Sequence, residues 1–301
     1  MDNKFQNNGE NNASIFERNQ KEIEAIIRNA LAEDIGKGDV TTDCIVPSGM
    51  IFTGQFITKE NGVLAGLPVA QKTFQLLNGY ISFHTNFKDG DFVKKETIFA
   101  EIEGDVRTIL KGERVALNFL QRMSGIATLT RQFVNAIKHT DCIILDTRKT
   151  VPGLRLLDKL AVVLGGGQNH RFGLYDMALI KENHITVAGS IKEAVQRVRT
   201  GDPEKRKIEV EVKNLEELQE ALSLDVDRIM LDNMTVTEIK KAVEMVAGKI
   251  PLEASGNITL ENVKEIAEAG VNYISIGKLT HSVKALDISL ILKKKDIINS
   301  F

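Results

Sequence analysis

The chain repeats a short apolar pattern: Ile208-Glu-Val-Glu-Val212, Arg228-Ile-Met-Leu231, Pro251-Leu-Glu-Ala254 and Tyr273-Ile-Ser-Ile276. Amphipathic segments of helical length separate these runs. Apolar runs that alternate with such segments are typical of parallel strands joined by helical crossovers. This stretch predicts an α/β fold, and its regular spacing favours a barrel.

Two earlier runs extend the series, Ile143-Ile-Leu145 and Ala178-Leu-Ile180. The intervening residues 151–172 are too irregular for an ordinary crossover. We therefore expect an incomplete (β/α) barrel of six to seven parallel strands. No internal sequence repeat is evident.

Residues 51–110 follow a different pattern, in which β-rich runs such as Ile51-Phe-Thr-Gly-Gln-Phe-Ile57 alternate with turn signals such as Asp89-Gly90. One helix is expected at residues 69–77. The segment predicts a small antiparallel sheet with a helix packed on it, which makes an N-terminal α+β sandwich domain.

The helical spacing of Ile23, Ile27 and Leu31 predicts a helix from residue 21 to about residue 35, followed by a loop at 36–42. Two further helices are expected, at 111–125 and 127–137, with a break at Ser124-Gly125.

Domain boundaries follow from these patterns. The first twenty residues are Asn-rich and poor in apolar side chains, so residues 1–20 are expected to be a disordered tail. The N-terminal domain is expected at 21–125 and the barrel domain at 126–286.

Composition narrows the class of protein. The 301 residues carry 39 Lys and Arg against 41 Asp and Glu, a net charge of -2, so the broad basic field of a nonspecific nucleic-acid binder is lacking. Cys44 and Cys142 lie outside any metal-binding spacing. No apolar run reaches the length of a membrane span, and the N-terminus does not resemble a signal peptide. We expect a cytoplasmic protein with no nucleic-acid or membrane partner.

Five cationic side chains gather in one part of the sequence, between Asp146 and Lys181. They are Arg148, Lys149, His170, Arg171 and Lys181. Apolar, strand-like residues flank them, so these cations are expected at the ends of buried strands, where an anionic ligand offsets the cost of desolvation.

Polar residues end almost every predicted strand, including Asp146, Lys181, Glu211, Asp232 and Ser255. In a parallel barrel this edge carries the active site. A single polar residue there is commonly no more than a solvated strand end, but the repetition indicates a site.

Glu209 and Glu211 are two residues apart on one strand and therefore share a face. Such a pair needs a metal, a basic partner or ligand hydroxyl groups. One alternative is an ion pair with Lys181 or Lys149. The other is a hydrated Mg²⁺ shared with Asp232 on the neighbouring strand.

Turns at the last two strands, Ser255-Gly256-Asn257 and Ile276-Gly277-Lys278, are suited to holding a phosphate, although ordinary turn glycines also fit. Gly165-Gly-Gly167 matches no nucleotide-binding motif and is expected to bring His170 and Arg171 over the site.

Longer motifs are similar to the nicotinate-nucleotide pyrophosphorylase (carboxylating), or quinolinate phosphoribosyltransferase, family. The similarity covers residues 30–290. It rests on Glu113-Arg-Val-Ala-Leu-Asn-Phe-Leu-Gln-Arg, Asp146-Thr-Arg-Lys-Thr-Val-Pro-Gly153, Gly165-Gly-Gly-Gln-Asn-His-Arg171, Leu252-Glu-Ala-Ser-Gly-Asn-Ile258 and Gly277-Lys-Leu-Thr-His-Ser282. Ala254 departs from the family pattern, in which many members have serine.

The resemblance implies transfer of phosphoribosyl from phosphoribosyl pyrophosphate (PRPP) to quinolinate with release of CO₂, assisted by Mg²⁺, in NAD biosynthesis. It also implies a homodimer whose active sites are shared between subunits, with Arg114 reaching the partner's site, and a C-terminal segment 287–301 that joins the N-terminal domain.

The implied substrate-binding residues fall into three groups by ligand. Arg148, His170, Arg171 and Lys181 would bind the quinolinate carboxylates, with Lys149 in that pocket or at the pyrophosphate. Glu211 and Asp232 would bind the ribose and the Mg²⁺-pyrophosphate. Ser255, Gly256, Asn257 and Gly277 would hold the 5′-phosphate. Lys149, Glu211 and Asp232 are the expected catalytic residues.

Three other interpretations fit parts of the sequence. A molybdenum-linked relative would share the barrel, but the complete cation set favours the quinolinate enzyme. Lys181 also suits a Schiff-base aldolase. Residues 86–104 resemble a lipoyl-like carrier module, although they contain no modifiable lysine in a Met-Lys-Met turn.

Overall fold

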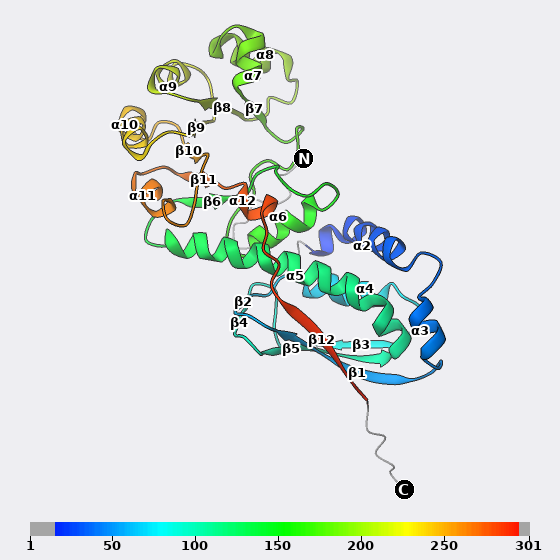
Figure 1. Ribbon diagram of the computed structural model, residues 1–301. Coiled ribbons are helices and arrows are strands. Elements are labelled where there is room, and N and C mark those ends of the chain that lie inside the picture. The colour runs from blue at the N-terminus through cyan, green and yellow to red at the C-terminus, as the bar shows by residue number, and fades with distance from the viewer. Residues whose placement is uncertain (1–15, 295–301) are drawn as a thin grey trace. The chain divides into compact units, whose positions relative to one another are not determined.

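The computed structural model describes residues 16–294, which form two compact units (Figure 1). The barrel unit consists of residues 130–150 and 167–281. The amino-terminal unit consists of residues 16–129, 151–166 and 282–294. Within residues 16–294, no helix combines the length and the apolar character that crossing a membrane requires.

The amino-terminal unit is built on a four-stranded antiparallel sheet in the order β12-β1-β5-β3. Its strands are β1 (Ile51–Thr58), β3 (Ile81–His84), β5 (Ile98–Asp105) and β12 (Ile288–Lys294). A separate pair joins β2 (Gly62–Val63) to β4 (Phe92–Val93). Strand β12 lies beside β1, so residues 288–294 belong to this sheet.

One face of this sheet is covered by helices, which include α4 (Leu67–Gln75) and α5 (Val106–Ala136) (Figure 1). Phe56 on β1 contacts Phe74 on α4 edge to face, with ring centroids 6.3 Å apart. Phe99 and Ile102 on β5 complete a core that is closed to solvent. These contacts confirm the predicted α+β sandwich.

The N-terminal helices differ from the expected boundaries at two points. Helix α2 (Gln20–Ile35) begins one residue earlier than predicted, and Asn19 before it is buried, so residues 16–20 are not part of a tail. Residues 1–15 of the expected tail lie outside the described part of the chain. Helix α3 (Val40–Ile45) occupies part of the predicted loop because Asp39 caps its first turn, accepting the N–H of Thr42.

Helix α5 runs unbroken for 31 residues, so the break predicted at Gly125 is wrong. A Cβ at this position would collide with the carbonyl oxygen of Lys284. Glycine is therefore present here because the segment leading to β12 crosses the helix closely.

Gly125→Ala is expected to lower the free energy of unfolding by about 1–3 kcal/mol, because the backbone at Lys284 must move. Urea unfolding monitored by circular dichroism measures the change. The matched control is Gly201→Ala at the end of helix α8 (Ile191–Gly201), where nothing lies within 4 Å of the added carbon. An unchanged midpoint for Gly125→Ala would contradict the close crossing.

The barrel unit contains six parallel strands in the order β6-β11-β10-β9-β8-β7. They are β6 (Ile143–Leu145), β7 (Ala178–Ile180), β8 (Ile208–Val212), β9 (Arg228–Asp232), β10 (Leu252–Ser255) and β11 (Tyr273–Ser275). The helices are α7 (Glu182–Ala188), α8 (Ile191–Gly201), α9 (Leu215–Leu222), α10 (Val236–Val246), α11 (Val263–Glu268) and α12 (Lys278–His281). The predicted α/β class and all six strands are confirmed.

The barrel is incomplete between β6 and β7, which do not pair within the described residues. Gln168 alone makes an isolated bridge with Leu145 on β6. Helix α6 (Arg155–Leu164), which follows β6, belongs to the amino-terminal unit. There Asp158 accepts two hydrogen bonds from Arg122 on α5, at 2.7 and 2.8 Å. Residues 151–166 and 282–286 therefore group with the amino-terminal unit, not with the expected barrel domain 126–286.

Candidate active site

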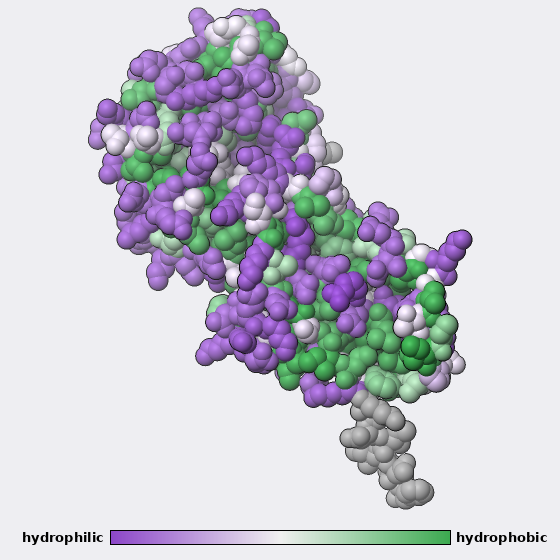
Figure 2. Space-filling model, in the orientation of Figure 1, coloured by the Kyte–Doolittle hydropathy of each residue, from purple (hydrophilic) through white to green (hydrophobic). Residues whose placement is uncertain are grey.

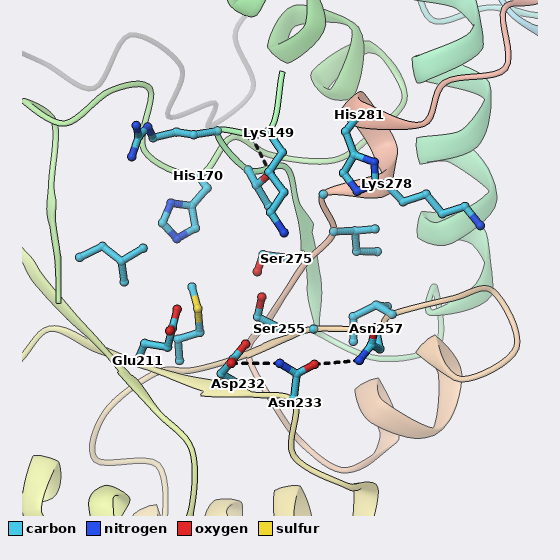
Figure 3. Close-up of a pocket in the computed structure, with 18 of the residues that line it drawn as sticks. Lys149, His170, Glu211, Asp232, Asn233, Ser255, Asn257, Ser275, Lys278 and His281 are labelled. Carbon is cyan, nitrogen blue, oxygen red and sulfur yellow. Dashed lines mark hydrogen bonds between the residues drawn. The ribbon is translucent and has the colours of Figure 1, made fainter. Parts of the chain in front are cut away.

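A cavity of about 890 Å³ opens at the carboxyl edge of the parallel sheet (Figure 3). It is lined by eleven of the twelve residues expected to bind substrate, which are Arg148, Lys149, His170, Arg171, Lys181, Glu211, Asp232, Ser255, Gly256, Asn257 and Gly277. The exception is Arg114, which is exposed on α5 in the amino-terminal unit. These eleven residues come from strand ends far apart in the sequence and line one cavity.

Strand register explains how the cavity floor is built. Glu211, Met230 and Glu253 are direct partners on β8, β9 and β10, and Asp232, Ser255 and Ser275 form the next row on β9, β10 and β11. Residues directly paired on parallel strands point to the same face, so each row forms a layer inside the sheet. The row of Asp232, Ser255 and Ser275 lines the cavity, as do Glu211 and Met230 of the other row.

Lys149 lies in the loop after β6, and its backbone is fixed at two atoms. Its N–H is donated to Thr147 Oγ1 at 3.0 Å, and its carbonyl oxygen accepts the Thr280 hydroxyl at 2.9 Å. Gly277 leaves room for the side chain, because a Cβ there would lie 2.9 Å from Lys149 Cδ and 3.1 Å from His281 Cδ2. The aliphatic stem of Lys149 thus passes directly over the turn after β11.

Asp146, fully buried at the end of β6, holds the loop that carries His170 and Arg171. Its Oδ1 accepts the His170 N–H at 3.0 Å, and its Oδ2 accepts the side-chain amide of Asn169. Arg171 is almost buried and donates to the Met177 carbonyl oxygen at 3.0 Å. Burial and the neighbouring charge of Arg148 lower the pKa of Arg171. Two adjacent guanidinium groups in this setting favour a negatively charged ligand.

The two acidic residues of the cavity have different partners. Glu211 forms an ion pair with Lys181, which is one of the alternatives considered for it. Asp232 accepts a hydrogen bond from Asn233 Nδ2 at 3.0 Å. Two carboxylates on neighbouring strands remain within the cavity, where they can meet a ligand's hydroxyl groups or a cation.

The turn after β10 is organised around Asn233. Its Oδ1 accepts the side-chain amide of Asn257 at 2.9 Å, as Figure 3 shows. Gly256 has a φ of 95°, and a Cβ there would collide with Asn233. Both constraints require glycine, so backbone groups of Ser255, Gly256 and Asn257 border the cavity without bulky side chains between them.

Sequence reasoning missed several lining residues, among them Thr147, Leu179, Met230, Thr259 and Ser275. Met230 and Ser275 lie within apolar runs and carry no chemical signal of their own. Alternation along each strand, counted back from Asp232 and Gly277, would have identified both. Glu209, which was expected to share a face with Glu211, lies beneath the cavity and does not line it.

Glu211 and Asp232 are the candidate ligands for a divalent cation. Their oxygen atoms suit Mg²⁺, which typically takes one or two carboxylates together with phosphate oxygens and water. The two carboxylates alone do not make a complete site, since Glu211 is also paired with Lys181. They therefore fit a cation that arrives with a phosphate-bearing substrate.

The partial barrel and its cation-rich cavity define an α/β enzyme that acts on polyanionic substrates. Family models for the quinolinate phosphoribosyl transferase N-terminal and C-terminal domains match residues 39–124 and 126–291. The chain belongs to the quinolinate phosphoribosyltransferase family.

Individual relatives agree with the family models. Nicotinate-nucleotide pyrophosphorylase (carboxylating), chloroplastic, of Arabidopsis thaliana is 46% identical over 288 residues, which cover 89% of this chain and 82% of that protein. A probable nicotinate-nucleotide pyrophosphorylase (carboxylating) of Bacillus subtilis is 43% identical and covers 90% of this chain and 94% of its own length. The crystal structure of NadC from Streptococcus pyogenes matches with a TM-score of 0.88 at 41% identity, covering 92% of this chain and 98% of that one.

Proposed function

We propose that this chain transfers the phosphoribosyl group of PRPP to quinolinate and releases CO₂, giving nicotinate mononucleotide and pyrophosphate in NAD biosynthesis. The observation that carries the proposal is the convergence of Arg148, Lys149, Arg171 and Lys181 on one cavity. Quinolinate carries two carboxylates and PRPP carries two phosphate-bearing arms, so both substrates need such a site. The names of the relatives support the same reaction.

Each substrate has a proposed place in the cavity. Arg148, Arg171 and Lys181 bind the two quinolinate carboxylates, and Lys149 lies between that pocket and the pyrophosphate. The turn of Ser255, Gly256 and Asn257, together with Gly277, receives the 5′-phosphate through backbone N–H groups. Glu211 and Asp232 bind the ribose hydroxyls. The support for these places is that all these residues line one cavity.

Charge stabilisation accounts for the first chemical step. The bond from ribose C1 to pyrophosphate breaks, the pyrophosphate leaves with the electron pair, and the quinolinate nitrogen forms the new bond to C1. Positive charge develops on the sugar and negative charge on the leaving group, so Glu211 and Asp232 stabilise the former and Lys149 the latter. No protein nucleophile is required.

Decarboxylation follows from the charge on the product ring. Once the pyridine nitrogen is bonded to ribose it is cationic, and the adjacent carbon–carboxylate bond breaks to release CO₂. The electron pair left on the ring carbon is stabilised by the cationic nitrogen until a proton is taken up. The guanidinium groups of Arg148 and Arg171 keep the ring in place during both steps.

Mg²⁺ is the proposed cofactor, with Asp232 and Glu211 as its protein ligands, directly or through water and pyrophosphate. When bound, it would neutralise charge on the departing pyrophosphate. The carboxylate oxygens of Glu211 and Asp232 support this choice, because Mg²⁺ prefers oxygen ligands.

A homodimer is the proposed assembly, with Arg114 of one subunit completing the site of the other. Exposed apolar side chains on the amino-terminal unit support an interface: Val40, Ile45 and Ile51 on α3 and β1 are 78%, 72% and 40% exposed (Figure 2). We also propose a cytoplasmic location without nucleic-acid or membrane partners. The net charge of -2 supports the absence of a nucleic-acid partner.

Purified protein given quinolinate, PRPP and Mg²⁺ is expected to form nicotinate mononucleotide and CO₂. Chromatography of the nucleotide and trapping of labelled CO₂ measure both products. Nicotinate replaces quinolinate in the control, which should give little product because one of the two carboxylates is missing. If folded protein converts neither compound, the molybdenum-linked relative becomes the better interpretation.

A further inference from the structure

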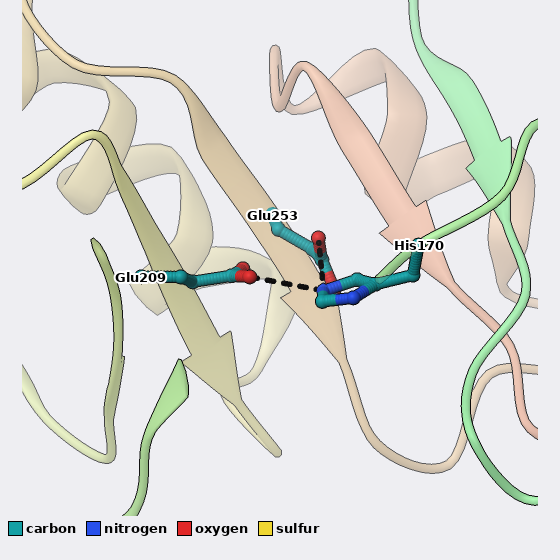
Figure 4. A group of neighbouring side chains, drawn as sticks. All are labelled: His170, Glu209 and Glu253. Carbon is teal, nitrogen blue, oxygen red and sulfur yellow. Dashed lines mark ion pairs between the residues drawn. The ribbon is translucent and has the colours of Figure 1, made fainter. Parts of the chain in front are cut away.

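Glu209 on β8 and Glu253 on β10 are fully buried beneath the cavity, and neither lines it. Both point toward the imidazole of His170, as Figure 4 shows. His170 Nε2 lies 2.9 Å from Glu209 Oε2 and 3.4 Å from Glu253 Oε2. Removing two carboxylates from solvent costs free energy, so favourable interactions with neighbouring charged groups must offset that cost.

Neighbouring charges supply part of that compensation. Arg228 donates to Glu253 Oε2 at 2.9 Å and stacks on the Tyr273 ring, with 4.1 Å from its guanidinium carbon to the ring centroid. Despite burial, His170 and Arg228 hold the pKa of Glu253 below its ordinary value, whereas burial and the charge of Glu253 raise the pKa of Glu209. Burial opposes the charged form of His170, whereas the two nearby carboxylates favour it.

The hydrogen bond at Nδ1, the second ring nitrogen of His170, shows which nitrogen of the ring carries the proton. His170 Nδ1 accepts the backbone N–H of Arg171, with 2.7 Å between the nitrogens. A nitrogen that accepts this bond carries no proton, so the ring proton is on Nε2 and faces the carboxylates.

The same argument excludes a metal ion in this group. The ligand atoms of His170, Glu209 and Glu253 lie within 4.8 Å of one another, which would otherwise suit one. A metal needs the lone pair of Nε2, but that nitrogen is protonated while Nδ1 accepts from Arg171. The three side chains are better suited to fixing an orientation.

The orientation of His170 fixes the position of its neighbour Arg171, which lines the cavity. Its backbone N–H is held by Asp146 at 3.0 Å, and its ring receives the N–H of Arg171. The peptide between His170 and Arg171 is therefore held from both sides. The Arg171 side chain, which starts from this peptide, lines the cavity.

We propose that Glu209 and Glu253 are positioning residues: by holding the His170 imidazole inside the sheet, they fix Arg171 where it meets the quinolinate carboxylates. The inference rests on the proposed function for the identity of the ligand. It also changes the role expected for His170, since both ring nitrogens have partners within the protein and the residue acts through Arg171.

The test compares Glu209→Ala with Glu209→Gln. Removing the nearer carboxylate should raise the KM for quinolinate by about tenfold or more, since small displacements of a binding group have effects of this size. The KM for PRPP should stay within about twofold, because its proposed contacts do not include the His170–Arg171 loop. Glu209→Gln keeps an acceptor for Nε2–H and should recover most of the lost affinity. Glu253→Gln should have a smaller effect in the same direction.

A spectroscopic measurement tests the geometry independently of turnover. Nitrogen-15 spectra of the histidine side chains, with His170→Asn used for assignment, should show His170 protonated on Nε2 and unprotonated on Nδ1. This pattern should be lost in Glu209→Ala. Glu193→Ala is the matched control, because Glu193 is a partly exposed glutamate paired with Arg197 on α8.

Each contrary outcome has a separate meaning. A protonated Nδ1 in the unaltered protein, or an unchanged quinolinate KM in folded Glu209→Ala, would overturn the inference. Equal losses for both substrates without recovery in Glu209→Gln would also overturn it, in favour of a general structural role. If the unaltered protein did not convert quinolinate, the proposed function would fail, and the spectra would still decide whether the carboxylates hold His170.

Discussion

Arg114→Ala is expected to reduce quinolinate turnover by about 100-fold or more while leaving the fold intact, because a guanidinium that binds a substrate anion cannot be replaced by water. Arg114 is exposed on α5, so its truncation removes no core contact. Steady-state rates and circular dichroism measure the two effects. The matched control is Arg28→Ala on α2, an exposed arginine of the same unit, which should keep full activity.

Mixing Arg114→Ala with Lys181→Ala tests whether sites are shared between subunits. If each site combines Arg114 of one chain with Lys181 of the other, half of the randomly formed dimers contain one intact site. About a quarter of the original activity should then return, from the symmetry of a two-fold dimer. If no activity returned after demonstrated exchange of subunits, Arg114 would act within its own chain.

Asp232→Asn is expected to lower kcat by about 10²–10³-fold, because it removes a negative charge at the place where positive charge develops on the ribose. Asparagine keeps an oxygen that can accept the bond from Asn233 Nδ2, so the turn after β9 should keep its shape. The Mg²⁺ concentration for half-maximal rate should rise as well. Stopped-time assays across a range of Mg²⁺ concentrations measure both changes.

Asp225→Asn is the matched control for that substitution, since Asp225 is well exposed and paired only at the surface with Arg199. Binding of quinolinate alone, measured by calorimetry, should stay within about twofold in Asp232→Asn, because the dicarboxylate contacts are made by other residues. A kcat within threefold of the unaltered protein would remove Asp232 from the proposed chemistry.

Hydrophobic periodicity correctly predicted the strands and helices in which the pattern of buried and exposed residues is visible within the segment itself. The runs at 208–212 and 228–231 became β8 and β9 because their residues are buried on both faces of a parallel sheet. The break predicted at Gly125 failed for a different reason. Local propensity treats glycine as a helix end, whereas here a distant segment at Lys284 requires the space.

Candidate site residues were predictable where charge is unusual for a strand end, as at Arg148, Lys181 and Asp232. Sequence reasoning did not single out Glu253, because this glutamate lies within an apolar run, Pro251-Leu-Glu-Ala254, and not at the end of a strand. Its partners His170 and Arg228 come from separate parts of the chain, and only their approach within 3.4 Å shows what the glutamate does.

The sequence by itself determined the parallel α/β class, the separate antiparallel domain and the chemical character of the site, because apolar spacing and charge are properties of local segments. The tertiary structure alone decided that α6 belongs with the amino-terminal unit and that His170 is held from below by two buried glutamates. These features depend on contacts between residues far apart in the chain, and such contacts leave no periodic trace in the sequence.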